Sequence, residues 1–158
     1  MATIKTILYP TDFSEYSQAA IPFVVDLANR FDAEVHCLHV IDMDHEFFMA
    51  SGYTLPLLTN LPDKEQMRGA AREHLEGFVK EQLSTVNREV LKTVVFGKAF
   101  EQIVNYARQE HIDLIVIGTH GHSALATMLL GNVAEKVIRK APCPVLSVRH
   151  AEHVFKTP

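Results

Sequence analysis

The chain has 158 residues, of which 47% are hydrophobic, and this suffices for one compact domain with a sizeable core. A net charge of −4 without a Lys/Arg cluster argues against a nucleic-acid surface, and no apolar run approaches the ~20 residues of a membrane span. The two cysteines, Cys37 and Cys143, lie far apart, and the N-terminus lacks the three-part pattern of a signal peptide. We therefore expect a cytoplasmic protein without disulfides.

Short apolar runs alternate with helical patterns along the chain. The runs are rich in Val, Ile and Leu, as is typical of parallel strands covered on both faces. They span Ile4–Tyr9, Glu34–Ile41, Val90–Phe96, Leu114–Ile117 and Pro144–Val148. Apolar residues at helical spacing predict helices over about residues 20–31, 64–86 and 100–110, and from Asn132 onward. The alternation predicts a single open α/β domain over residues 1–150, followed by a tail at 151–158.

The structure can test several details of these helices. The stripe of the first helix comprises Ala20, Phe23, Val24, Leu27, Ala28 and Phe31. Pro22 lies within this helix and predicts a kink. The second helix has one apolar face, made of Met67, Ala71, Leu75, Phe78 and Val79, and the third has Ile103, Val104 and Ala107. The fourth helix carries the apolar residues Val133, Val137 and Ile138.

The segment Asp42–Asp63 is longer than an ordinary connection. Its apolar residues include Phe47, Phe48 and Tyr53, so a lid and a subunit interface are both reasonable interpretations. A packed surface loop with a short helix at Glu46–Ala50 is an equally good one.

A glycine-punctuated segment follows the fourth apolar run and precedes the fourth helix. It begins Gly118-Thr-His-Gly-His-Ser and ends Gly131-Asn132. The first amides of a helix have no intrahelical partners, so such a segment predicts an anion site, most commonly for phosphate. No Lys follows these glycines as in a Walker A loop, and the first strand is followed by Pro-Thr-Asp-Phe-Ser instead of a Gly-x-Gly-x-x-Gly fingerprint.

The spacing Gly118-x2-Gly121-x9-Gly131 resembles the ATP-binding branch of the universal stress protein family. Two further blocks support this resemblance, Ile7–Ser14 and Ala141–Val148. It implies a Rossmann-like, adenine nucleotide alpha hydrolase-like fold, with a five-stranded parallel sheet in the order 3-2-1-4-5 and helices on both faces. It also implies a dimer and a bound adenine nucleotide, ATP, ADP or AMP, which Mg²⁺ can accompany, held mainly by phosphate oxygens. The last apolar run, Pro144–Val148, should lie at the sheet edge, where an open strand invites pairing with a second chain, so we expect a homodimer through it.

The resemblance also assigns binding residues. Asp12 would accept hydrogen bonds from the ribose hydroxyls, and the main chain of Val40 would contact adenine. The phosphates would be surrounded by Gly118, Gly121, His122, Gly131, Asn132 and Val133. The other residues expected in the site are Pro10, Thr11, His120 and Ser123. Asn132 departs from the pattern of the ATP-binding branch, in which Ser or Thr follows the last glycine.

Other interpretations of these residues stay open. Asp12 and Glu15 stand at capping-box spacing, so Asp12 could instead cap the first helix. Neither His120-x-His122 nor His36-x-x-His39 has a third ligand nearby, and residues 36 and 39 of a strand face opposite sides, so we expect no metal site. No catalytic group is evident, and without the usual Lys and paired carboxylates we expect ATP hydrolysis to be slow at most.

The sequence therefore favours a stress-response sensor or adaptor that binds an adenine nucleotide. The first alternative is a dimeric interaction module of the same fold that binds an unknown protein partner and no nucleotide, which Asn132 favours. An enzyme such as an adenylyl transferase ranks third, because neither a Ser-Gly-Gly loop nor a His-x-x-His motif follows the first strand.

Overall fold

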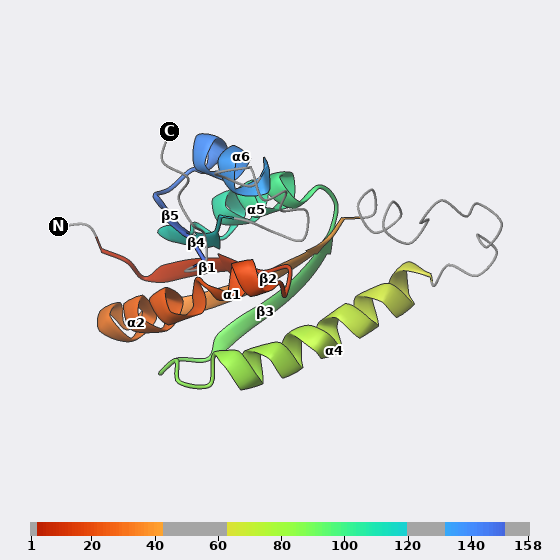
Figure 1. Ribbon diagram of the computed structural model, residues 1–158, viewed down its shortest axis with the longest axis horizontal. Coiled ribbons are helices and arrows are strands. Elements are labelled where there is room, and N and C mark those ends of the chain that lie inside the picture. The colour runs from red at the N-terminus through yellow and green to blue at the C-terminus, as the bar shows by residue number, and fades with distance from the viewer. Residues whose placement is uncertain (1–2, 43–62, 120–131, 151–158) are drawn as a thin grey trace.

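Five parallel strands form one sheet in the order β3-β2-β1-β4-β5 in the computed structural model, which describes residues 3–42, 63–119 and 132–150 (Figure 1). The strands are β1 (Thr6–Pro10), β2 (Glu34–Ile41), β3 (Val90–Phe96), β4 (Leu114–Gly118) and β5 (Val145–Val148). The predicted fold class and strand order are thus confirmed. β2 and β3 have the predicted bounds, whereas β1 begins and ends later than the apolar run Ile4–Tyr9.

β1 lies at the centre of the sheet because its residues are apolar on both faces. Ile7, Leu8 and Tyr9 are fully buried, and Ile7 pairs with Val35 of β2 on one side and Leu114 of β4 on the other. Near-continuous apolar runs are what a parallel strand covered by two helical layers requires. The carboxyl end of β1 is therefore held in the middle of the sheet edge.

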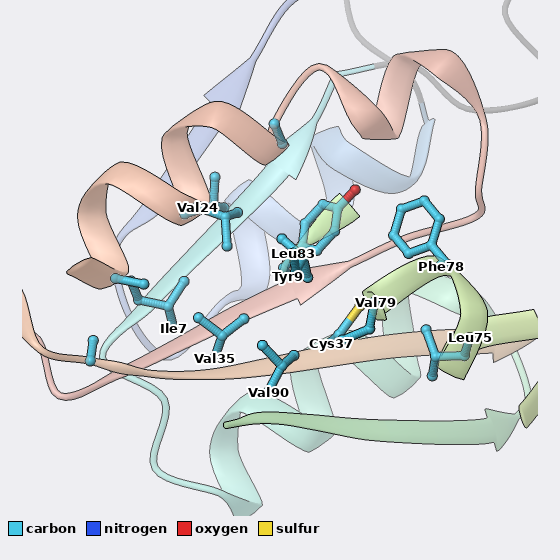
Figure 2. Close-up of a cluster of buried hydrophobic side chains, with 14 of the residues drawn as sticks. Ile7, Tyr9, Val24, Val35, Cys37, Leu75, Phe78, Val79, Leu83 and Val90 are labelled. Atoms are coloured by element: carbon cyan, nitrogen blue, oxygen red, sulfur yellow. The ribbon is translucent and has the colours of Figure 1, made fainter. Parts of the chain in front are cut away.

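Two helical layers cover the sheet. On one face α2 (Ile21–Phe31) packs against β1 and β2, and α4 (Lys64–Gln82) packs against β2 and β3. Figure 2 shows Tyr9, Val24, Phe78 and neighbouring side chains in this core. On the other face α5 (Ala99–Gln109) and α6 (Asn132–Lys140) pack against each other and against strand residues such as Leu8 and Ile115.

The predicted kink at Pro22 is wrong. The chain forms two helices here, α1 (Glu15–Gln18) and α2, and Pro22 lies in the first turn of α2. A proline in the first helical turn loses no intrahelical hydrogen bond, because its missing N–H would have had no partner there. Pro22 thus helps to start a helix that we expected it to bend.

The predicted apolar stripe of the first helix is only partly correct. Val24 and Ala28 of α2 are buried, whereas Phe23 and Phe31 are 49% and 47% exposed. α6 shows the same pattern, since it buries Ala134 and Val137 but exposes Val133 and Ile138. In both helices the buried stripe is narrower than the sequence suggests, so apolar residues beside it face outward.

α4 has a capping box that the sequence analysis missed. The Asp63 side chain accepts from the Gln66 amide at 2.8 Å, and the Gln66 side chain accepts from the Asp63 amide at 3.3 Å. The helix ends at Gln82, before the predicted Val86. The Asn29 side chain then donates to the Thr85 carbonyl, at 2.9 Å, and so binds the following turn to α2. The apolar face of α4 and the position of α5 agree with prediction.

Residues 43–62 lie outside the described residues, so the predictions for the segment Asp42–Asp63 stay predictions. Just before them, the Asp42 carboxylate accepts from the amide of Ala99, the first residue of α5, at 3.4 Å. Within the described ranges, none of the helices has the length and apolar character needed to cross a membrane.

Candidate functional site

The carboxyl ends of β1 and β4 lie side by side at one edge of the sheet, because these two strands are parallel neighbours. On one side of β1 the sheet continues with β2 and then β3, and on the other side it continues with β4 and then β5. Ligands of open α/β sheets bind where the strand order reverses in this way. Pro10 and Gly118, the last residues of β1 and β4, flank this point.

The turn from Thr11 to Ser14 is fixed by hydrogen bonds. The Thr11 amide donates to the Leu38 carbonyl of β2 at 2.9 Å, and the Phe13 amide donates to Thr11 Oγ1 at 3.0 Å. The Asp12 carboxylate accepts from the Ser14 amide at 3.0 Å and also from the Ser14 hydroxyl. Asp12 is thereby held, half-buried, at the carboxyl end of the central strand.

Asp12 does not cap α1, so that alternative is wrong. Ser14 is the N-cap, and its Oγ accepts from the Ser17 amide at 3.2 Å. Asp and Ser are both preferred at helix N-termini. The helix starts after Ser14, which puts Asp12 outside it, where its carboxylate orients Ser14.

Phe13 has a backbone φ of 63°, a left-handed conformation that is uncommon for a bulky residue. Its ring contacts His39 of β2, with centroids 4.4 Å apart, and His74 of α4 at 4.0 Å. The ring also makes an edge contact with Phe78 of α4 at 5.3 Å. The sequence analysis assigned no role to Phe13 or His74. The aromatic residue directly after Asp12 could have indicated that ring contacts hold this turn.

His39 also hydrogen-bonds the turn. Its Nδ1 lies 2.9 Å from the Thr11 carbonyl oxygen. A carbonyl oxygen can only accept, so Nδ1 must carry the proton and donate. His39 therefore contacts both residues that flank Asp12, Thr11 through its Nδ1 and Phe13 through its ring.

Close packing of α1 explains why position 118 is a glycine. A Cβ at this position would lie 2.9 Å from Ser17 Cα and even closer to the Tyr16 carbonyl oxygen of α1. The Tyr9 hydroxyl donates to the Ser17 carbonyl at 3.0 Å, so the same short helix is also bonded to β1. Burial raises the pKa of the Tyr9 phenol well above its usual range, which keeps this hydroxyl a donor. Gly118 thus lets α1 approach the end of β4.

The structure describes only part of the glycine-punctuated segment. The Thr119 amide donates to the Val148 carbonyl at 2.9 Å, and this continues the pairing of β4 with β5. His120, Gly121, His122, Ser123 and Gly131 lie outside the described residues. Asn132 and Val133 are the first two residues of α6, as predicted, and both are exposed.

Val40 directs its main chain toward the site. Successive residues of a strand offer their backbone groups to alternate neighbours. The Leu38 carbonyl accepts from Thr11 on the β1 side, and the Ile41 carbonyl accepts from Gly97 on the β3 side. The N–H and C=O of Val40 must therefore face the β1 side, beyond the last β1–β2 pair, Pro10 and Leu38.

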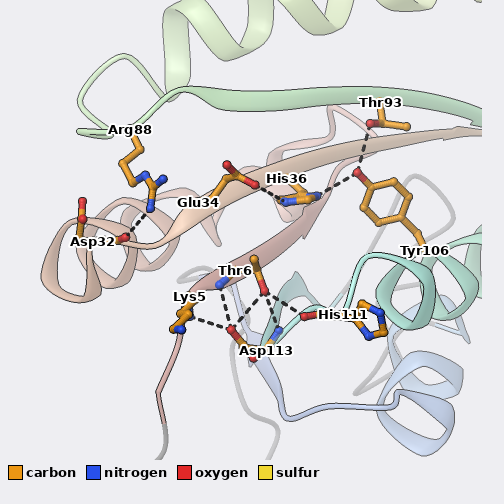
Figure 3. A network of polar contacts seen from close by, with 10 residues as sticks. All are labelled: Lys5, Thr6, Asp32, Glu34, His36, Arg88, Thr93, Tyr106, His111 and Asp113. Carbon is orange, nitrogen blue, oxygen red and sulfur yellow. Dashed lines mark hydrogen bonds and ion pairs between the residues drawn. The ribbon is translucent and has the colours of Figure 1, made fainter.

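The histidines of β2 face opposite sides, as expected. His39 contacts Phe13, whereas the buried His36 lies on the other face, where its Nδ1 is 3.0 Å from the Tyr106 hydroxyl of α5 (Figure 3). The His36 Nε2 is 3.0 Å from Glu34 Oε1. This network leaves His36 no free ring nitrogen. Within the described ranges, no three His, Cys, Asp or Glu side chains group as metal ligands would.

An open groove of about 530 Å³ lies elsewhere, between α2 and the end of α4. It is lined by Asp26 and Arg30, which pair with each other at 2.9 Å, and by Asn29, whose side chain bonds the backbone of Thr85 and Asn87. These polar groups already have partners, so we place the candidate site at the carboxyl edge of the sheet.

The architecture and the position of Asp12 define a class of protein: open, doubly covered α/β domains with a ligand site at the reversal of strand order. The chain belongs to the universal stress protein family, whose sequence profile matches residues 3–149. It is 36% identical over 155 residues to the universal stress protein MJ0577 of Methanocaldococcus jannaschii, covering 92% of this chain and 94% of that protein.

Solved structures support the same conclusion. The structure of MJ0577 superposes with a TM-score of 0.77 at 35% identity and covers 95% of this chain and 99% of that one. The universal stress protein of Archaeoglobus fulgidus in complex with dAMP has a TM-score of 0.62 at 20% identity and covers 94% of this chain and 99% of that one. At that identity the second structure supports the fold alone.

Proposed function

We propose that this protein binds an adenine nucleotide, ATP, ADP or AMP, between the ends of β1 and β4. Asp12 accepts hydrogen bonds from the ribose hydroxyls, and the main chain of Val40 contacts adenine. Pro10 and Thr11 complete the wall on the β1 side. Backbone amides surround the phosphates, from Gly121, His122, Gly131, Asn132 and Val133, with His120 and Ser123 beside them. Gly118 contributes by letting α1 approach.

One observation supports this proposal above all others. The Asp12 carboxylate is held by Ser14, outside α1, at the point where the strand order reverses. A carboxylate accepts hydrogen bonds only, which suits the vicinal hydroxyls of a ribose. α6 begins at Asn132 and runs antiparallel to the strands, so its first amides point to the same edge.

The proposed role is that of a cytoplasmic stress sensor or adaptor whose state depends on the bound nucleotide. Asp12 is the single carboxylate of the turn after β1, and no Lys follows Gly118, Gly121 or Gly131. Phosphoryl transfer normally uses such groups to handle charge, so we propose slow ATP hydrolysis at most. Any Mg²⁺ would arrive with the nucleotide and be held mainly by phosphate oxygens.

Calorimetric titration with ATP, ADP and AMP tests this function, and Asn132 provides the informative variants. Asn132→Ser introduces the hydroxyl of the ATP-binding branch and should tighten ATP binding by up to ~1 kcal/mol, about one hydrogen bond. Asn132→Ala should weaken it only modestly, because the backbone amides remain. If wild type gives no heat with any nucleotide while Asn132→Ser binds ATP, the interaction-module alternative replaces this proposal.

We also propose a two-fold symmetric homodimer formed through β5. This strand lies at the sheet edge and pairs only with β4 among the described strands. The Pro144 carbonyl accepts from Ile115 of β4, and the Val148 carbonyl accepts from Thr119, the residue after β4. Backbone groups of a strand alternate between its two sides, so the N–H and C=O of Val145 face away from β4. An open edge of this kind invites pairing with a second chain.

Val145→Pro should therefore weaken the dimer without unfolding the protomer, because proline is tolerated where the N–H of an edge strand faces away from its sheet. Light scattering at micromolar concentration measures the mass, and circular dichroism checks the fold. Leu146→Pro is the matched control, since its N–H faces β4 and its loss should destabilise the protomer itself. A wild-type monomer would contradict the proposal.

A further inference from the structure

The Phe13 ring contacts two histidine rings that come from different parts of the fold. His39 is on β2 and His74 on the exposed surface of α4, and the His74 ring is nearly parallel to the Phe13 ring, at 20°. The His39 ring is tilted by 33° against Phe13, so Phe13 stacks on His74 and makes a tilted contact with His39. The contact with His74 connects α4 to the turn that holds Asp12.

The backbone of this turn needs such support. A left-handed conformation at a residue other than glycine is strained and persists only where the surroundings impose it, as at Phe13. The Phe13 carbonyl accepts from Gln18 Nε2 at 2.9 Å, and the Thr11 carbonyl accepts from His39. Both neighbours of Asp12 are thus fixed, Thr11 by β2 and Phe13 by its ring contacts and by α1.

We propose that His74 is a positioning residue for Asp12 and that it acts through Phe13. This inference rests on the proposed nucleotide site and assigns control of its ribose contact to α4. The His74 ring lies closer to Phe13 than the His39 ring does, with centroids at 4.0 Å against 4.4 Å. Without His74 the strained turn loses a stacking partner and adopts other conformations, in which the Asp12 carboxylate no longer faces both ribose hydroxyls.

Affinities for ATP and 2′-deoxyATP, measured by calorimetry, test this role. An aromatic pair is worth about 0.5–1.5 kcal/mol, so His74→Ala should weaken ATP binding by up to about tenfold. The loss for 2′-deoxyATP should be smaller, so the preference for ATP falls. His74→Phe should restore both values, and Glu73→Ala, at the neighbouring exposed position of α4, should match wild type.

A measurement without ligand separates this inference from the proposed function. The Ser14 amide donates to the Asp12 carboxylate, so its hydrogen exchange reports how firmly the turn is held. His74→Ala should accelerate that exchange by up to about tenfold, and His74→Phe should reverse the effect. Unchanged exchange at Ser14 overturns the inference. If His74→Ala accelerates the exchange at Ser14 but the wild-type protein binds no nucleotide, the inference about the turn is retained. The proposed function is then overturned.

Discussion

Gly118→Ala should lower the stability of the protein by about 1–3 kcal/mol or more, the usual cost of forcing a group into packed space. The added Cβ would meet the backbone of Tyr16 and Ser17, which cannot turn away as a flexible side chain can. α1 would have to move from the end of β4, and the bond from the Tyr9 hydroxyl to Ser17 would be strained with it. For a chain of this length we expect the melting temperature to fall by roughly 3–10 °C.

Alanine substitutions at two other glycines are controls that should change the stability in the opposite direction. Gly69 and Gly77 lie on the exposed surface of α4, and a Cβ at either would contact nothing within 4 Å. Alanine there should stabilise the protein by up to ~1 kcal/mol, because glycine is a poor helix former. Differential scanning calorimetry without ligand compares the three variants. If Gly118→Ala weakens ATP binding but leaves the melting temperature unchanged, Gly118 serves the ligand and the packing explanation is wrong.

The strands could be predicted because the apolar runs that identify them are local in sequence and pronounced. Runs such as Val90–Phe96 and Leu114–Ile117 carry enough Val, Ile and Leu to identify buried strands, and helical patterns separate them. The strand order came from the resemblance, since apolar patterning by itself does not determine which strands are neighbours. Both features were confirmed.

The details of the candidate site depend on tertiary contacts that no local pattern contains. Asp12 and Ser14 are equally good caps in isolation, and only the folded structure shows that Ser14 takes this role. The glycine pattern suggested phosphate for Gly118, whereas the approach of α1 explains it. His39 belongs to a His-x-x-His pair, a spacing that invites comparison with metal sites. In the structure it instead contacts the Thr11 carbonyl and the Phe13 ring, which folding brings close to it.

Asp12→Ala should weaken ATP binding roughly tenfold to hundredfold, the equivalent of about 1.5–3 kcal/mol for hydrogen bonds to a charged acceptor. The variant should bind 2′-deoxyATP almost as well as ATP, because the group that distinguishes the sugars is gone. Asp12→Asn should fall between wild type and Asp12→Ala, since one oxygen remains and a donor replaces the other. Calorimetric titration of each variant with both nucleotides measures the affinities.

Some loss of stability must accompany Asp12→Ala, because the Ser14 amide and hydroxyl lose their acceptor. Asp63→Ala is the matched control, since it removes an aspartate that accepts from a backbone amide at the start of α4. We expect each variant to lose about 1 kcal/mol of stability, within the range of cap removals, but only Asp12→Ala to lose ATP affinity and sugar discrimination. If both variants bind both nucleotides as wild type does, the Asp12 carboxylate only orients Ser14, and the ribose is contacted elsewhere.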